Sequence, residues 1–507
     1  MRTSSLWTGR WAVFASAFLL LLAPMLIWAL ASPLGSVPDE PSHAIRAAAV
    51  VRGEPVSQPW AEHPSLALAA VPRYVAELRD RTCFAFRPQV SAACVTLPSG
   101  NPNEIILTGT SAANNGPLFY AIVGLPTLFL SGDIALYLMR FVNAILTAAL
   151  LAGVFMQVSL FTRSRWTMAA VALAATPMVF FLGGSINPNA VEAASAALLF
   201  VTLVGILRSP STRGVLWERC VTVVVAVALL LGTRSISLLW LLAGIVAALV
   251  FSDRSVLRVL VRRPAAWIAL AGSTAVAFFA LVWFASPPLL RGVPLAGAGT
   301  SPAAAFVSTL ARSFDFSSSF VGLFGWEDTP SPSFTILIIG SAAMLMVFAA
   351  LIWGTGRARW VSLGFVVLLL LVPPITQALV VSHLGYIWQG RYMLAIFLCL
   401  LISCGMAIDE ASDGRALLGR SRVSLIVGVT LIGLGHFASL ETTLRRYMVG
   451  DHGAIQSMIL APEWQPPFGL AVLTLAMITW ASSAAYAVVG RLDDAQSILY
   501  RTTPHRV

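Results

Sequence analysis

Lysine is missing from this chain, and charge of either sign is scarce. All 32 basic residues are arginine, Asp and Glu together number 22, and charged residues make up 11% of the 507. Soluble domains carry about a quarter charged residues, so this composition excludes an ordinary soluble protein. The net charge of +10 is better explained by membrane topology than by nucleic acid, and we expect no nucleic-acid partner.

Cysteine is also scarce, which excludes a disulfide-rich scaffold. The chain has five cysteines, and neither their number nor their spacing suggests a zinc site. Cys83 and Cys94 lie in the longest early polar region. A disulfide between them is expected if that region faces an oxidising compartment, and two free thiols are the alternative.

Apolar sequence dominates instead. Hydrophobic residues make up 58% of the chain, and the mean hydropathy is +0.83. Apolar runs of roughly 17–26 residues, long enough to cross a bilayer as helices, recur about twelve times. They lie near 11–32, 134–158, 166–183, 189–207, 219–232, 236–252, 265–286, 333–353, 360–381, 392–408, 424–440 and 468–490. We expect an all-α integral membrane protein with about 12 transmembrane helices, the first of them retained rather than cleaved as a signal peptide.

One shorter run, 117–131, decides the topology. It contains Gly124 and Pro126, and we expect it to be a juxtamembrane or re-entrant helix on the outer face. Both chain termini are then cytoplasmic, and the short basic loops fall inside, as the positive-inside rule requires. The arginines concerned are Arg163, Arg165, Arg208, Arg213, Arg219, Arg254, Arg258, Arg262, Arg263, Arg357, Arg359, Arg415, Arg420, Arg422, Arg491, Arg501 and Arg506. If 117–131 crossed the membrane, nearly all of them would fall outside.

This topology divides the chain into two parts. Residues 1–440 form a multispan membrane domain with a first outer loop at 33–133 and a second at 287–332. Residues 441–507 supply a third outer loop, the last transmembrane helix and a short cytoplasmic tail. Since the outer loops are long and the cytoplasmic ones short, we expect the functional residues on the outer face.

Two adjacent carboxylates follow the first span. Asp39 and Glu40 are placed where one of them can act as a general base or both can bind a divalent cation. His43 lies on the same side as Asp39 if the segment is helical. The alternative is a solvated helix exit, with Pro38 and Pro41 as turn residues.

Several other polar residues map to the same face. In the turn 184–189, Asn187 is a candidate ligand group, and Asn189 is a candidate helix cap. Arg140 and Glu192 lie inside spans, where either a mutual ion pair or a ligand role is expected.

Arginines and tryptophans complete the candidate set. Arg234 and Arg391 break the positive-inside trend, so both are candidates for binding a phosphate. For Arg234 the alternative is snorkelling to headgroups. Trp326 is either an interfacial anchor or a stacking platform for a sugar ring. The remaining substrate-binding candidates are Glu327, Trp388 and Gln389.

The spaced motifs resemble a known family. In order they are 38–43 (PDEPSH), 116–120 (GPLFY), 185–189 (SINPN), 325–328 (GWED) and 389–392 (QGRY). Over about residues 10–440 they resemble the bacterial polytopic membrane proteins of the domain of unknown function 2142 family. That family is in turn similar to the C-type (GT-C fold) membrane glycosyltransferases. The stretch 116–120 departs from the Pro-Pro-Leu-Tyr-Tyr pattern of better-known relatives.

This resemblance implies a function. It implies a GT-C-like fold with juxtamembrane helices, Asp39 as catalytic base, and Glu40 supporting it or binding a cation (Mg, Mn or Ca). The sugar donor would be linked to polyprenyl phosphate, and membrane lipid would be a further partner. The acceptor would be a cell-envelope glycan, lipid or protein at the outer face of the bacterial plasma membrane.

Two other functions remain open. A multispan transporter or lipid flippase also suits about twelve spans, and a non-catalytic partner in envelope polysaccharide assembly is the third hypothesis. No two-fold internal repeat is visible, and the polar groups gather at the outer edge of the membrane rather than at its midplane.

Overall fold

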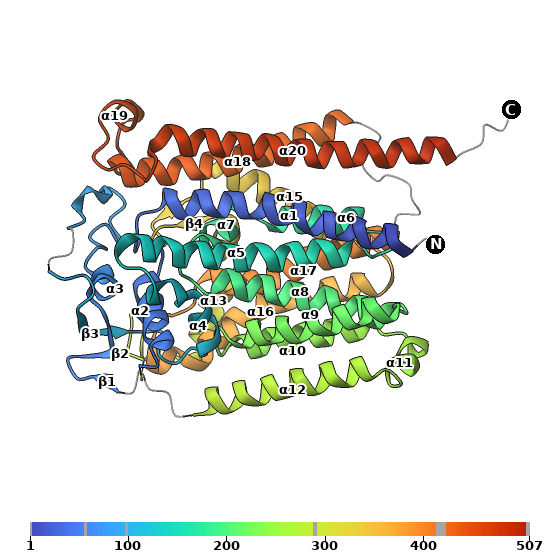
Figure 1. Ribbon diagram of the computed structural model, residues 1–507, viewed down its shortest axis with the longest axis horizontal. Helices are drawn as coiled ribbons and strands as arrows, with labels where there is room; N and C mark the ends of the chain where they lie inside the picture. The colour runs from blue at the N-terminus through green and yellow to red at the C-terminus, as the bar shows by residue number, and fades with distance from the viewer. Residues whose placement is uncertain are drawn as a thin grey trace.

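The computed structural model is a bundle of long helices with small elements gathered at one end (Figure 1). It describes residues 3–54, 58–96, 100–286, 290, 292–411 and 422–502, without the side chains of 3–8, 422, 424–425 and 489–502. The predicted cytoplasmic arginines Arg415, Arg420, Arg422, Arg491, Arg501 and Arg506 have side chains outside this description.

Ten helices of the described chain are long and apolar enough to cross a membrane. They are α1 (Thr3–Ala31), α5 (Gly132–Val158), α8 (Asn189–Arg208), α9 (Arg213–Leu231), α12 (Pro264–Ala285), α15 (Ser333–Ile352), α16 (Gly356–Leu384), α17 (Leu394–Ala411), α18 (Arg422–Val449) and α20 (Gly469–Thr502). The number rises to 12 if each of two bent helix pairs is one span. The twelve apolar runs of the sequence each lie in one of these helices or bent pairs.

The bent pairs have different geometries. In the first pair, α6 (Arg165–Ala174) meets α7 (Pro177–Gly183) at 61°. Pro177 causes this break because proline lacks an N–H and keeps the preceding residue, Thr176, out of the helical conformation. In the second pair, α10 (Ser237–Val250) and α11 (Arg254–Leu260) are bent by 116°.

Small elements cluster at the end that carries α2 (Glu40–Val51), which we call the loop-rich end (Figure 1). The short helices here are α3 (Arg73–Ala76), η1 (Glu77–Arg79), η2 (Ala92–Cys94), α4 (Pro117–Val123), η3 (Leu125–Leu128), α13 (Pro302–Ala311), η4 (Asp315–Ser317), α14 (Ser318–Val321), η5 (Gly390–Met393) and α19 (Ile455–Leu460). The opposite end carries α11 and the start of α1 (Figure 1).

The loop-rich end also contains two small sheets that the all-α expectation did not include. In the first, β1 (Pro59–Trp60), β2 (His63–Pro72) and β3 (Ile105–Thr110) are antiparallel in this order. The second pairs β4 (Leu323–Phe324) with β5 (Thr329–Pro330). The second sheet closes a tight turn over residues 325–328.

The run 117–131 does not form a spanning helix. It consists of α4 and η3, which have seven and four residues. Its position is set by packing on α2, since a Cβ on Gly124 would lie 2.4 Å from the Ala47 carbonyl oxygen. With this run excluded, successive spans place the described basic loops at the end opposite α2.

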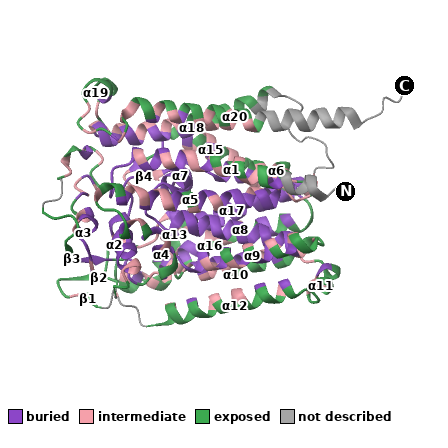
Figure 2. Cartoon of the chain, in the orientation of Figure 1, coloured by how far each residue is buried: buried purple, intermediate pink, exposed green. Residues whose placement is uncertain are grey.

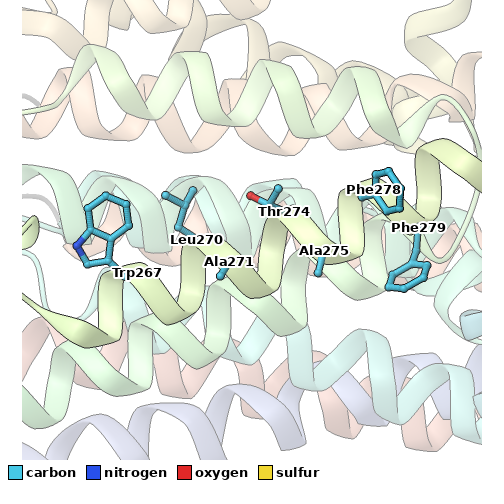
Figure 3. Close-up of a pocket in the computed structure, with 7 residues that line it drawn as sticks. All are labelled: Trp267, Leu270, Ala271, Thr274, Ala275, Phe278 and Phe279. Atoms are coloured by element: carbon cyan, nitrogen blue, oxygen red, sulfur yellow. The ribbon is translucent and has the colours of Figure 1, made fainter.

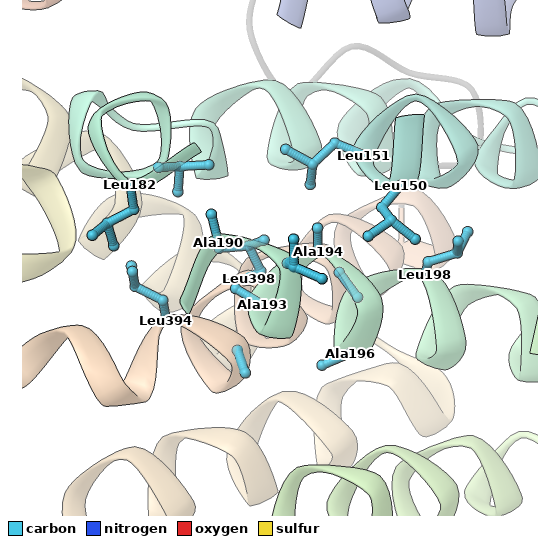
Figure 4. Packing of buried hydrophobic residues seen from close by; sticks show 14 of the residues in the cluster. Leu150, Leu151, Leu182, Ala190, Ala193, Ala194, Ala196, Leu198, Leu394 and Leu398 are labelled. Atoms are coloured by element: carbon cyan, nitrogen blue, oxygen red, sulfur yellow. The ribbon is translucent and has the colours of Figure 1, made fainter. Parts of the chain in front are cut away.

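The centre of the bundle lies along α8 and α17. Within their most apolar windows, 83% and 94% of residues are buried, against 6% for α12 at the edge (Figure 2). Figure 4 shows leucines of α5, α7 and α17 packed around the alanines of α8, whose small side chains allow a close approach. The loop-rich ends of α8 and α17 are therefore rigid supports for nearby side chains.

Candidate functional site

Glu40 is the anchor of the segment after α1. Its carboxylate is paired with Arg140 of α5 by two bonds of 2.6 and 2.7 Å, and both side chains are fully buried. Arg140 also donates to the carbonyls of Ala29, Ser32 and Pro33 at the end of α1. A cation at a helix C-terminus stabilises carbonyls that have no partner within the helix.

Both oxygens of Glu40 are therefore occupied by protein groups. Besides the two bonds from Arg140, they accept from the backbone N–H groups of Gly35 and Ile186, each at 3.0 Å. This arrangement satisfies a buried charge and fixes the start of α2. It fits the supporting role considered for Glu40.

The turn at 184–189 supports the same segment. Asn187 donates to the Pro38 carbonyl at 3.1 Å and accepts from the Asn189 N–H at 3.0 Å. Asn187 therefore supplies the side-chain oxygen at the start of α8. The expectation that Asn189 is the cap is wrong, because the chain turns one residue earlier, at Pro188.

Asp39 faces a different arginine. Its Oδ2 lies 2.9 Å from Arg391 Nη2, while Arg391 Nη1 lies 2.9 Å from Glu327 Oε1. The Arg391 side chain is 1% exposed, but Asp39 is 46% and Glu327 28% exposed. A buried cation thus holds two carboxylates that remain accessible from outside the protein.

The backbone is unusual at both carboxylates. Asp39 has φ 64° and Glu327 has φ 62°, two of four non-glycine residues with positive φ in the described chain. A third, Phe86 at φ 58°, has its ring 5.4 Å from that of Trp326, the neighbour of Glu327. Such conformations cost roughly 1–3 kcal/mol each and gather at functional sites.

A second arginine lies beside this cluster. Arg234 is paired with Glu192 of α8 at 2.5 Å, and Ser237 donates to the same carboxylate. The Tyr392 ring centroid lies 4.6 Å from the Arg234 guanidinium carbon and 5.5 Å from that of Arg391. The ion pair considered between Arg140 and Glu192 does not form, because each is paired elsewhere.

Several buried donors here have no hydrogen-bond partner in the described part of the chain. They are Nε of Arg234, Nε of Arg391 and Nε1 of Trp388, and the buried Oε1 of Gln389 likewise has none. The Trp388 ring packs edge-on to Tyr392. In contrast, Trp326 Nε1 is bonded to the Gly35 carbonyl. Unpartnered buried donors are costly unless a ligand or water accepts from them.

His43 lies on α2, in the electrostatic field of the same groups. Its Nδ1 is 2.8 Å from the hydroxyl oxygen of Tyr120 on α4. Burial lowers the pKa of His43 to about 4; Asp39 opposes this shift, and Arg234 and Arg391 add to it. Burial also raises the pKa of the Glu327 carboxyl, and the positive charge of Arg391 partly opposes this rise.

Sequence reasoning missed Arg446 of α18. This buried side chain donates to Asp328 at 3.1 Å and to the carbonyls of Phe84 and Val90 at 2.7 and 2.9 Å. The two carbonyls lie in the loop closed by the Cys83–Cys94 disulfide, whose Cα atoms are 6.1 Å apart. No motif identifies such a residue, because its partners are mainly backbone oxygens.

Other possible sites lack this chemistry. No cluster of three His, Cys, Asp or Glu that could hold a metal ion occurs among the described residues. A hollow of about 550 Å³ along α12 is lined by apolar side chains and Thr274 (Figure 3). Another of about 510 Å³ lies at Glu441, Met458 and Phe468. Neither hollow includes the Asp39–Arg391–Glu327 cluster.

Comparison with known proteins gives a family. The model of a predicted membrane protein family, DUF2142, matches residues 21–400. No curated protein and no solved structure matches the chain. The matched region is narrower than the expected 10–440. It includes Asp39, Arg234, Glu327 and Arg391 but ends before Arg446.

Proposed function

The chain belongs to the DUF2142 family of predicted membrane proteins, and we propose that it is a glycosyltransferase with a GT-C-like fold. It transfers a sugar from a polyprenyl-phosphate donor to a cell-envelope glycan, lipid or protein at the outer face of the plasma membrane. The Asp39–Arg391–Glu327 cluster is the observation that carries this proposal. It combines an accessible carboxylate with a buried cation at the loop-rich end.

Asp39 is the proposed base. The acceptor hydroxyl gives its proton to the Asp39 carboxylate as its oxygen bonds to the anomeric carbon of the sugar. The bond from that carbon to the donor phosphate breaks, and its electron pair stays on the phosphate. The 46% exposure of Asp39 supports this role, whereas the buried and fully bonded Glu40 is a positioning residue.

Arg391 and Arg234 are the proposed phosphate ligands. The Nε groups of both have no partner in the described residues, so both retain a donor for a phosphate oxygen. Fixed cations stabilise the charge that develops on a leaving phosphate. Trp388 supplies a third unpartnered donor beside them, and Trp326 a ring for sugar stacking.

The orientation has two independent supports. The described basic loops share the end of the bundle opposite α2, which favours a cytoplasmic location for that end. The Cys83–Cys94 disulfide lies at the loop-rich end and favours an oxidising compartment there. In this orientation α4 and η3 are juxtamembrane elements of the outer face.

Substituting Asp39 tests the proposal. With Asp39→Asn we expect loss of sugar transfer of at least about 10²-fold, because the amide cannot accept the proton. Envelope glycans and lipids are compared between cells with the parent chain and the variant, and donor-lipid binding is measured on purified protein. Donor binding should persist.

The exposed Asp315 at the loop-rich end provides the matched control. Asp315 pairs with Arg312 at the protein surface, so Asp315→Asn should leave the amount of transferred sugar unchanged. Unchanged product with Asp39→Asn would overturn the catalytic assignment. Transport of a labelled solute by purified protein in vesicles would instead favour the transporter or flippase.

A further inference from the structure

We infer that Asn115 and Tyr120 are positioning residues that hold His43 uncharged with its proton on Nε2, so that Nε2–H donates to a ligand oxygen beside Asp39. The assignment of a ligand there rests on the proposed function. The protonation state of His43 does not rest on the proposed function, because it is argued from the two contacts of the Tyr120 hydroxyl and from the burial of both rings.

The three side chains form one chain of contacts that runs from the half-buried Asn115 to the buried Tyr120 and His43. Asn115 Nδ2 donates to the Tyr120 hydroxyl oxygen at 2.8 Å, and that oxygen lies 2.8 Å from His43 Nδ1. The His43 and Tyr120 rings are nearly parallel, with centroids 5.9 Å apart. Tyr120 is fully buried and His43 is 7% exposed. Water is therefore largely kept from the Tyr120–His43 contact.

The direction of the protons follows from the donor inventory. The amide nitrogen of Asn115 can only donate, so Tyr120 accepts from it. The hydroxyl proton of Tyr120 is left for His43 Nδ1, the other hydrogen-bond partner of this oxygen among the described residues, and we infer that Nδ1 accepts it and is unprotonated. A proton on Nδ1 would place a second N–H against Tyr120 and leave the buried hydroxyl proton without an acceptor among the described residues, which is unfavourable.

Burial of His43 favours the same uncharged state and is the main cause of its lowered pKa. Arg234 and Arg391 disfavour a positive imidazole, and Asp39 favours it. The net effect of burial and these three groups is a lowered pKa. His43 is thus an unsuitable cation or base near neutral pH, but a neutral imidazole remains a hydrogen-bond donor.

That donor is available. Among the residues that the structure describes, no group is hydrogen-bonded to His43 Nε2, and this atom is not among the fully buried unpartnered ones. Asp39 lies four residues earlier, at the start of α2. Asp39 is also close enough to contribute to the electrostatics of His43. The inferred Nε2–H is suited to a hydroxyl, carbonyl or phosphate oxygen of a ligand bound beside Asp39.

Nitrogen NMR of histidine-labelled protein tests the assignment. We expect the His43 signals to show Nε2–H and unprotonated Nδ1 between about pH 5 and 8, without titration. His43→Gln identifies the signals by their loss. Tyr120→Phe removes the donor to Nδ1, so His43 should become a mixture of tautomers and its pKa should rise by about one unit or more.

Tyr74→Phe is the matched control. Tyr74 is another buried tyrosine of the loop-rich end, whose hydroxyl donates to the Leu130 carbonyl, so its removal should leave the His43 signals unchanged. A proton on Nδ1, or titration of His43 near its ordinary pKa in the parent protein, would overturn the inference. Neither result bears on transfer by Asp39, so failure here is separable from failure of the proposed function.

Discussion

At the scale of single residues, Asp39 and Glu40 are held by different cations. Asp39 meets Arg391 of the segment before α17, and Glu40 meets Arg140 of α5. Because Asp39 adopts a left-handed backbone conformation at the start of α2, the two side chains take separate directions. One carboxylate stays accessible, and the other is sealed between α1 and α5.

This division predicts different effects of neutralising each carboxylate. Glu40→Gln would leave the Arg140 charge buried without its counter-ion, and we expect a loss of about 3–5 kcal/mol in unfolding free energy. Thermal unfolding of detergent-solubilised protein measures the effect. Glu104→Gln is the control, because Glu104 pairs with Arg73 at the surface and should cost at most about 1 kcal/mol. Equal stability of both variants would contradict the anchoring role.

Sequence reasoning identified candidate groups but few of their partners. Asp39, Glu327 and Arg391 were all candidates, and the structure brings them together. Asn115 was not a candidate, and Tyr120 appeared only within the 116–120 motif, without a role of its own. Pairing across hundreds of residues depends on helix packing, which a single sequence does not reveal.

At the scale of elements, the helices follow the apolar runs, but the loops do not follow any simple pattern. The spans are long and strongly apolar, so their number could be predicted to within the two bent pairs. The strands β2 and β3 pair through a loop more than thirty residues long, and such non-local pairing has only a weak local signal.

The disulfide loop is an element with a testable role. The Cys83–Cys94 bond closes a loop of sequence separation 11, and a loop of about 15 residues contributes about 3 kcal/mol in the chain-entropy account. The double variant Cys83→Ser, Cys94→Ser should therefore unfold at lower temperature. Loss of the disulfide should also make the carbonyls of Phe84 and Val90, which accept hydrogen bonds from Arg446, more mobile.

Treatment with a reductant separates the effect of losing the disulfide from any effect of the two serine substitutions. It should lower the unfolding temperature of the parent protein and leave the double variant unchanged, because the other described cysteines are buried thiols. If reductant shifted both proteins equally, the stabilisation would not come from this bond.

At the scale of the whole molecule, the two ends of the bundle differ in chemistry. The loop-rich end holds the disulfide, the sheets and the Asp39–Arg391–Glu327 cluster, and the other end holds the short, arginine-containing loops. If the positive-inside rule applies, every group proposed for sugar transfer faces away from the cytoplasm. The proposed transfer would then draw its lipid-linked donor from the membrane at that face.

Cysteine labelling decides this orientation. Asn103 lies exposed at the loop-rich end and Thr162 lies exposed beside Arg163 and Arg165 at the other. With a membrane-impermeant maleimide, Asn103→Cys should be labelled in intact cells, and Thr162→Cys only after permeabilisation. The parent chain is the control and should remain unlabelled, since its described cysteines are disulfide-bonded or buried. The reverse pattern would place Asp39 in the cytoplasm, where the proposed outer-face transfer could not occur.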